Sequence, residues 1–288
     1  MKKIILILAI LIFNFIMAAP GYAIKIGLLT QVDEAGVGVN VNGRMIDVYT
    51  NKTVCTADAM KGYVLVPYNN EIAVKAGGKA YTLGTGAIVL RPDNDGYVSA
   101  KGKWYHGKLL IKNMGGKLTV INDIDLENYI KGVVPSEMPA SWEYEALKAQ
   151  AIASRSFALA NLGKQAKYGY DLKDNTDDQA YGGASSETNI TNRAVEETHG
   201  LVLTYDMKII SAYYSASAGG MTSNSVWGGY APYLHSVPSF DDAVGKKGHG
   251  VGMSQHGANN LAKQGYNAYQ ILQYFYSNIK FAKLNKET

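Results

Sequence analysis

Short stretches of alternating apolar and polar residues dominate the first third of the chain. Ile24 to Leu28 and Tyr63 to Val66 are examples, and turn-forming pairs such as Asn42-Gly43 and Asp95-Gly96 lie between stretches of this kind. A period of two residues is typical of strands, while Asn-Gly and Asp-Gly favour hairpin turns. We therefore expect a smaller β-rich region over residues 24–103.

The pattern changes further along the chain. Two more strand-like stretches are followed by a segment from Trp142 to about Asn161, in which Ser141 has the character of a helix N-cap. This segment is apolar on almost every side, which predicts a helix at the centre of a domain rather than on its surface. Two further helices are expected over residues 254–263 and 268–276.

These patterns together predict an α+β fold. We expect a twisted mixed sheet with packed helices over residues 104–282, preceded by the smaller β-rich region. No internal repeat interrupts this order, and the boundary near residue 103 rests on the change of pattern alone.

The first 23 residues have a different character. Lys2 and Lys3 precede an apolar run from Ile4 to Ile12, and Gly21-Tyr22-Ala23 resembles a small-x-small cleavage site. This arrangement predicts a signal peptide over residues 1–23, with an uncleaved membrane anchor as the alternative. In both cases the body of the protein is expected to be exported and to function outside the cytoplasm, in the cell wall or at the membrane.

Composition narrows the class of protein. Hydrophobic residues make up 47% of the 288 and charged residues 18%, which is typical of a folded chain, and the single Cys55 excludes an intramolecular disulfide. The net charge of +4 is too dilute to indicate nucleic-acid binding. The 21 tyrosines outnumber 6 phenylalanines and 3 tryptophans, and this excess fits either strands or sugar contacts.

Two charged residues are candidates for chemistry. Glu137 lies between Pro135 and Pro139, and its apolar neighbours would desolvate the carboxyl and favour its protonated form. The local sequence leaves open whether it is a general acid or a surface residue in a turn. Arg155 lies in the apolar helix and needs an anionic or hydrogen-bonding partner there, so it is either a structural tether or a site residue.

The glycine-flanked His249 is a third candidate, because glycines on both sides either let the backbone approach a ligand closely or form tight turns. The neighbouring sequence fails the G-x-S-x-G pattern of a serine hydrolase, since His256 stands where the second glycine should be. The chain also lacks an H-E-x-x-H motif and paired cysteines, so no metal and no other cofactor is expected.

Several ordered motifs resemble the SpoIID/LytB family, named for stage II sporulation protein D. The resemblance is strong over roughly residues 107–281. Its motifs are Val133 to Pro139, Ala146 to Ala158, Asp171-Leu172, Gln179 to Gly183, Ala194 to Gly200, Tyr213 to Thr222, Gly248 to Ala258 and Ile271 to Tyr276. Some sporulation members carry a metal near the segment that matches Tyr213 to Thr222. This segment has no Cys or His here, which argues against a metal.

The resemblance implies a lytic transglycosylase that cleaves peptidoglycan glycan strands. Glu137 matches the catalytic acid and Arg155 the supporting arginine of the following helix. A single glutamate suffices, because the 6-hydroxyl of N-acetylmuramic acid attacks within the same sugar and forms a 1,6-anhydro ring. A hydrolysing glycosidase would usually need a second carboxylate. The side chains expected to bind the glycan are those of His249, Tyr213, Ser215, Gln255 and Gln150.

The LytB branch of the family implies a second possibility. Its association with amidase activity favours a non-catalytic module that binds glycan and stimulates a cell-wall amidase. The expected partners are therefore glycan strands, an amidase and membrane proteins of a wall-remodelling complex, without nucleic acid. A structural wall protein with the family fold is a third alternative.

Overall fold

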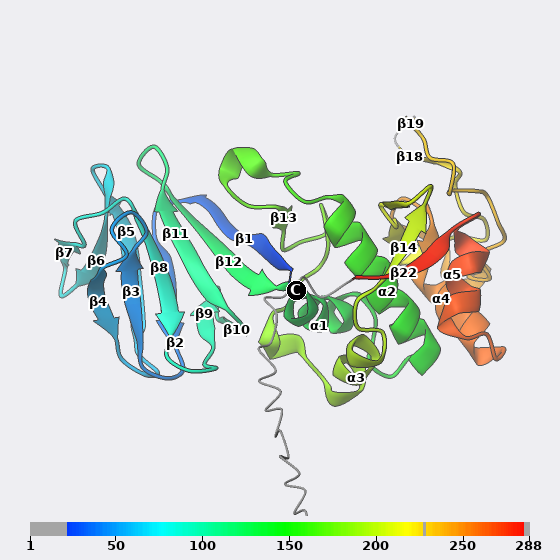
Figure 1. Ribbon diagram of the computed structural model, residues 1–288, viewed down its shortest axis with the longest axis horizontal. Helices are drawn as coiled ribbons and strands as arrows, with labels where there is room; N and C mark the ends of the chain where they lie inside the picture. The colour runs from blue at the N-terminus through cyan, green and yellow to red at the C-terminus, as the bar shows by residue number, and fades with distance from the viewer. Residues whose placement is uncertain (1–21, 227–228, 285–288) are drawn as a thin grey trace, which may run out of the picture.

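The computed structural model describes residues 22–226 and 229–284. The predicted signal peptide therefore lies, except for its last two residues, outside the described residues. In the ribbon view, two large sheets occupy one end of the molecule and the helices the other (Figure 1). No helix in the described ranges is long and apolar enough to cross a membrane.

The larger of the two main sheets has seven strands in the order β13-β1-β12-β11-β8-β3-β4. All its neighbours are antiparallel except β1 and β13, which run parallel. The strands are β1 (Ala23–Val32), β3 (Gly43–Asp47), β4 (Thr53–Ala57), β8 (Ala87–Pro92), β11 (Lys108–Asn113), β12 (Leu118–Asp125) and β13 (Leu172–Lys173).

The second main sheet has six strands in the order β10-β9-β2-β5-β6-β7 and is entirely antiparallel. Its strands are β2 (Ala35–Val39), β5 (Gly62–Tyr68), β6 (Glu71–Ala76), β7 (Lys79–Thr82), β9 (Val98–Ala100) and β10 (Lys103–Tyr105). Alternate side chains of both sheets, such as Met45, Leu65 and Leu90, are fully buried in one continuous core. This two-sheet arrangement confirms the expected β-rich N-terminal region.

The predicted boundary after residue 103 falls inside β10. The seven-stranded sheet also draws strands from both sides of that boundary, because β11 pairs with β8 and β12 pairs with β1. Residues assigned by sequence to two regions thus share one hydrogen-bonded sheet.

The helical part is arranged around one central helix. This helix, α2, packs against all four other α-helices and β14, and a run of its side chains from Ala146 to Ala158 is buried with Lys148 as the one exception. The helices are α1 (Leu126–Glu137), α2 (Tyr144–Ala160), α3 (Asn189–Glu197), α4 (Gln255–Lys263) and α5 (Ala268–Phe275). The expectation of a buried central helix is confirmed.

Some helix boundaries differ from those predicted. The N-cap of α2 is Glu143, without a side-chain cap, whereas Ser141 was expected in that position. The helix α1 was not predicted, because Gly132 and Pro135 lie inside it and both residues are unfavourable in helix interiors. Asp125 begins this helix by accepting hydrogen bonds from the backbone N–H groups of Glu127 and Asn128.

Short strands complete the helical part. Three of them form a small sheet, β14 (Leu201–Tyr205), β15 (Lys208–Ile209) and β22 (Lys280–Lys283). The others form pairs: β16 (Tyr214–Ser215) with β21 (Met253–Ser254), β17 (Ser217–Ala218) with β20 (Lys246–Lys247), and β18 (Ser225–Val226) with β19 (Gly229–Tyr230). Mixed sheets with segregated helices make the fold α+β, as predicted.

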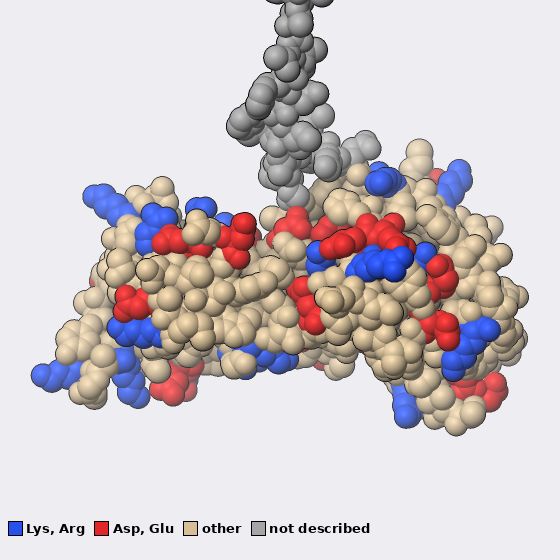
Figure 2. Space-filling model, turned by 90° about the horizontal axis from the view of Figure 1, so that it is seen from below, with Lys and Arg blue, Asp and Glu red and all other residues tan. Residues whose placement is uncertain are grey.

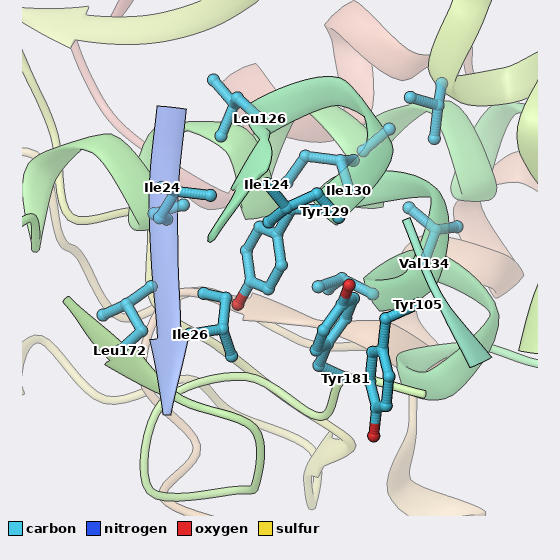
Figure 3. Close-up of a cluster of buried hydrophobic side chains, with 14 of the residues drawn as sticks. Ile24, Ile26, Tyr105, Ile124, Leu126, Tyr129, Ile130, Val134, Leu172 and Tyr181 are labelled. Atoms are coloured by element: carbon cyan, nitrogen blue, oxygen red, sulfur yellow. The ribbon is translucent and has the colours of Figure 1, made fainter. Parts of the chain in front are cut away.

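A cluster of tyrosine rings joins the β-rich end to the helices. The ring of Tyr181 lies 5.6 Å from that of Tyr105 and 4.9 Å from that of Tyr129, measured between centroids. Figure 3 shows these three rings beside Ile26 of β1 and Val134 of α1. The cluster leaves no room for a side chain at residue 132, since a Cβ atom on Gly132 would lie 2.5 Å from the ring of Tyr181.

Candidate active site

Glu137 is the last residue of α1, and its carboxyl accepts hydrogen bonds from three other segments. Its Oε1 accepts hydrogen bonds from the backbone N–H of Ala180 at 2.7 Å and the hydroxyl of Tyr214 at 3.4 Å. Its Oε2 accepts one from the side-chain amide of Gln255 at 3.1 Å. Three segments that are distant in sequence therefore hold this carboxyl in one orientation.

Burial raises the pKa of the Glu137 carboxyl above its usual value. The hydrogen bonds from Ala180, Gln255 and Tyr214 act in the opposite direction, because they stabilise the carboxylate, but burial has the larger effect. This is the direction indicated by the apolar neighbours in the sequence. A protonated carboxyl that is held in place can act as a general acid.

A pocket of about 720 Å³ opens beside Glu137. It is lined by residues from the end of α2, the 176–178 loop, the 213–216 segment and the 247–255 loop, among them Phe157, Lys164, Tyr213, Lys247 and His249. Asp177 and Asp178 also line it, and each forms an ion pair with a lysine, Lys173 and Lys164 respectively. A pocket of this size suits a sugar-sized ligand.

The groups around the carboxyl form a closed ring of hydrogen bonds. Gln255 donates to both Glu137 and the side-chain oxygen of Gln150, and Gln150 donates to the hydroxyl of Ser154 at 2.8 Å. Ser154 donates to the hydroxyl of Tyr214, which donates to Glu137. Because Gln150 and Ser154 are four residues apart on α2, the central helix presents both to the site.

A second contact fixes Tyr214 from the opposite side. Its hydroxyl accepts a hydrogen bond from the side-chain amide of Gln179 at 2.8 Å, while the Gln179 oxygen accepts one from the hydroxyl of Tyr129. Burial and the nearby Glu137 raise the pKa of Tyr214 well above its usual value. The Tyr214 hydroxyl therefore stays protonated and remains a donor to the carboxyl.

The structure brings most of the predicted glycan-binding residues to this pocket. Tyr213, Ser215, His249 and Gln255 line it, and Gln150 reaches it through the hydrogen-bonded ring. The His249 ring accepts a hydrogen bond from the backbone N–H of Val251 and lies edge-on to Tyr213. Burial lowers the pKa of His249, so its ring is neutral at neutral pH.

Arg155 lies elsewhere. Its side chain is fully buried, and its guanidinium donates to both carboxylate oxygens of Glu127 at 2.8 Å and to the carbonyl of Leu201. Within the described residues the guanidinium forms no hydrogen bond with Glu137. The geometry is that of the tether: Arg155 joins α2 to the first turn of α1.

Sequence reasoning passed over three groups that contact or orient the Glu137 carboxyl. They are the Tyr214 hydroxyl, the Ala180 backbone N–H and the Gln179 amide. The sequence contained a signal for Gln179 and Tyr214, because both lie within motifs that resemble the family, Gln179 to Gly183 and Tyr213 to Thr222. The Ala180 donor is a backbone N–H, which every residue except proline has, so the residue type could not reveal it. Only the fold shows that it lies beside Glu137.

Neither a patch of one charge on the face in Figure 2 nor a cluster of metal ligands in the described residues marks a further site. Lysines, arginines and carboxylates are intermixed over the face shown in Figure 2. Among residues 22–226 and 229–284, no group of three or more potential metal ligands comes together. A second pocket of about 500 Å³ lies beside the start of β1 and the ends of β8 and β12, and Glu137 does not line it.

The fold and the site together define an α+β protein with a buried, hydrogen-bonded glutamate beside a sugar-sized pocket. Comparison with known sequences identifies the family: residues 114–205 match the family model of stage II sporulation protein, SpoIID. This match includes Glu137, Gln150, Arg155 and Gln179, whereas Tyr214, His249 and Gln255 lie beyond it. The chain belongs to the SpoIID/LytB family.

Individual relatives cover different parts of the chain. The amidase enhancer of Bacillus subtilis is 50% identical over 107 residues, which are 36% of this chain and 14% of that protein. Stage II sporulation protein D of B. subtilis is 27% identical over 260 residues, covering 57% of this chain and 76% of that protein. An uncharacterised protein of Brachyspira hyodysenteriae is 32% identical over 196 residues, 67% of this chain and 49% of its own length. The chain thus spans about half of the last relative and a small part of the amidase enhancer.

Proposed function

We propose that this protein is an exported peptidoglycan lytic transglycosylase that acts in the cell wall. The observation that carries the proposal is the Glu137 carboxyl, which is held by three hydrogen-bond donors at the edge of a pocket large enough for sugar rings and whose pKa is raised by burial. Family membership supports a role in the cell wall. The bond to be cleaved joins N-acetylmuramic acid to N-acetylglucosamine.

In this mechanism Glu137 serves twice. Its proton passes to the glycosidic oxygen as the bond from that oxygen to C1 of N-acetylmuramic acid breaks. The 6-hydroxyl of the same sugar then attacks C1, and its proton returns to the Glu137 carboxylate. The product is a 1,6-anhydro sugar, no water is consumed, and the acid is regenerated for the next turnover.

The hydrogen-bonded ring would hold the Glu137 carboxyl in one orientation during both proton transfers. Tyr214, Ala180 and Gln255 stabilise the carboxylate that exists after the first proton transfer, so they oppose its immediate reprotonation from solvent. His249 and Tyr213 would contact the sugar at the pocket wall. Because the acid must be protonated at the start, cleavage should decline as pH rises through the raised pKa of Glu137.

The test is a digestion of purified, amidase-treated peptidoglycan, followed by mass analysis of the fragments. The wild-type protein should give anhydro sugars, lighter by one water than hydrolysis products. Glu137→Gln should reduce the rate by about 10²- to 10⁴-fold, whereas Glu196→Gln, a change at an exposed glutamate, should not. Products with ordinary reducing ends would instead indicate hydrolysis, with Asp177 or Asp178 as the second carboxylate.

Glu137→Gln should also leave the fold intact. A group whose pKa is raised by folding stabilises the protein only at low pH, and this contribution is lost as pH rises above the usual value of 4.5. Removing the ionisable group should therefore maintain or raise the melting temperature at neutral pH. Lost cleavage in a destabilised variant would not support a catalytic role.

A second function is favoured by one comparison. The 50% identity with an amidase enhancer supports a module that binds glycan and stimulates a cell-wall amidase without cleaving strands itself. In that case both wild type and Glu137→Gln would release no anhydro product, and both would accelerate a partner amidase equally.

A further inference from the structure

Asp241 is a buried carboxylate that the proposed mechanism does not use. Only 2% of the residue is exposed, and it forms no ion pair with any described residue. A carboxylate in such surroundings is costly unless hydrogen bonds compensate for the lost water. Its position therefore requires a structural or functional account.

Four donors surround the Asp241 carboxylate. Oδ1 accepts hydrogen bonds from the Gly220 backbone N–H at 2.8 Å and the Ser239 hydroxyl at 2.5 Å. Oδ2 accepts hydrogen bonds from the Ala218 backbone N–H at 2.7 Å and from the Ser254 hydroxyl. These bonds hold the pKa of Asp241 well below its usual value despite burial, because all four donors stabilise the carboxylate form.

The donors to Oδ2 come from two of the three segments that hold the Glu137 carboxyl. Ser254 is the N-cap of α4 and accepts a hydrogen bond from Gly257, and the next residue is Gln255, which donates to Glu137 Oε2. Ala218 ends the short segment that begins with Tyr214, which donates to Glu137 Oε1. The parallel pairing of β16 with β21 places the two segments side by side.

We propose that Asp241 is a positioning residue. It fixes the segment that carries Gln255 relative to the segment that carries Tyr214, and it thereby orients the Glu137 carboxyl. The inference rests on the proposed function, because it assumes that Glu137 is the group whose orientation matters. Asp241 touches no substrate; it acts through Ser254 and the 214–218 segment. The charge is needed because a carboxylate accepts from all four donors, whereas an amide places a donor against two of them.

The informative change is Asp241→Asn, with Asp242→Asn as its matched control. Asp242 is the neighbouring carboxylate and is exposed. The first readout is the titration of Glu137 in the protein without substrate, followed by carbon-13 NMR of labelled glutamate and assigned by comparison with Glu137→Gln. Asp241→Asn should raise the pKa of Glu137, because the bonds from Gln255 and Tyr214 lower it, while Asp242→Asn should leave it unchanged.

The second readout is glycan cleavage. Asp241→Asn should lower kcat by about 10- to 100-fold, since small displacements of a catalytic group have effects of this size, and should change KM little. An unchanged Glu137 titration in a folded Asp241→Asn protein would overturn the proposal. If the wild type cleaves no glycan, the proposed function fails, yet the titration still decides the role of Asp241.

Two serine variants test the proposal if Asp241→Asn does not fold. Ser254→Ala and Ser239→Ala each remove one hydroxyl donor to Asp241, and both serines are buried. Only Ser254 is adjacent to a residue that donates to Glu137, namely Gln255. Ser254→Ala should therefore raise the pKa of Glu137 more than Ser239→Ala does. Equal effects of the two substitutions, or none, would count against positioning through Asp241.

Discussion

At the scale of the residue, the site consists of one acid and the donors that constrain it. Neighbouring tyrosines at positions 213 and 214 have different surroundings: the Tyr214 hydroxyl donates to Glu137, whereas the Tyr213 carbonyl accepts from Met253 and Tyr276 and its ring lines the pocket. Residue type alone does not distinguish them. Their substitution by phenylalanine therefore separates control of the acid from contact with the sugar.

Tyr214→Phe should lower kcat for glycan cleavage by about 10-fold, the effect of losing one hydrogen bond of about 1.5 kcal/mol to a charged group. It should also raise the pKa of Glu137, moving the decline of the pH–rate profile to higher pH. Tyr213→Phe should act mainly on KM and leave that profile in place. Steady-state kinetics from pH 4 to 8 would measure both, and identical profiles for the two variants would refute the distinction.

At the scale of the element, the ion pair between Arg155 and Glu127 links α1 to α2. Arg155→Met leaves Glu127 partly buried without its partner, which costs about 3–5 kcal/mol of unfolding free energy. The exposed pair Arg193–Glu197 is a matched control, and Arg193→Met should cost no more than about 1 kcal/mol. Denaturant unfolding measures both values. A fully stable Arg155→Met protein that no longer cleaves glycan would instead indicate that Arg155 acts in the active site.

Elements differ in how well the sequence predicts them. The apolar helix α2 and strands such as β1 and β5 are evident from periodicity, because their side-chain pattern is set by burial, whereas the two-residue β13 is too short to show a period. The helix α1 is not, since Pro135 and Gly132 are poor helix formers that tertiary contacts tolerate; Gly132 is required by the close approach of Tyr181. Glu137 was identified by its motif, but the closed ring through Gln150 and Ser154 depends on contacts between residues that are 60 to 118 positions apart in sequence.

At the scale of the whole molecule, the β-rich region is joined to the helical part by a shared sheet and also supports the site. Lys101 pairs with Asp174 and the Trp104 backbone N–H donates to Ser185, so the β9–β10 hairpin contacts both ends of the loop that carries Ala180. His106 pairs with Glu187 just beyond that loop. The position of the Ala180 donor thus depends on residues at the boundary between the two regions, of which Lys101 belongs to the N-terminal one.

A fragment of residues 104–288 should therefore not fold on its own. It lacks β1 and β8, the partners of β12 and β11, and would expose two apolar strands. Near-ultraviolet circular dichroism and thermal unfolding, with residues 24–288 as the reference, would test this expectation. A cooperative transition in the fragment would instead show that the sequence boundary at residue 103 separates independent domains.

The tyrosine cluster has a consequence for the range of pH over which the molecule holds together. Burial raises the pKa of Tyr105, Tyr129 and Tyr181 above the ordinary 10.0, so their hydroxyls ionise more readily in the unfolded chain than in the folded one. Stability supplied by these rings is complete below pH 10 and decreases as pH rises beyond it. Alkali should therefore separate the β-rich end from the helices, and the phenolate absorbance of these three rings would appear together with unfolding rather than before it.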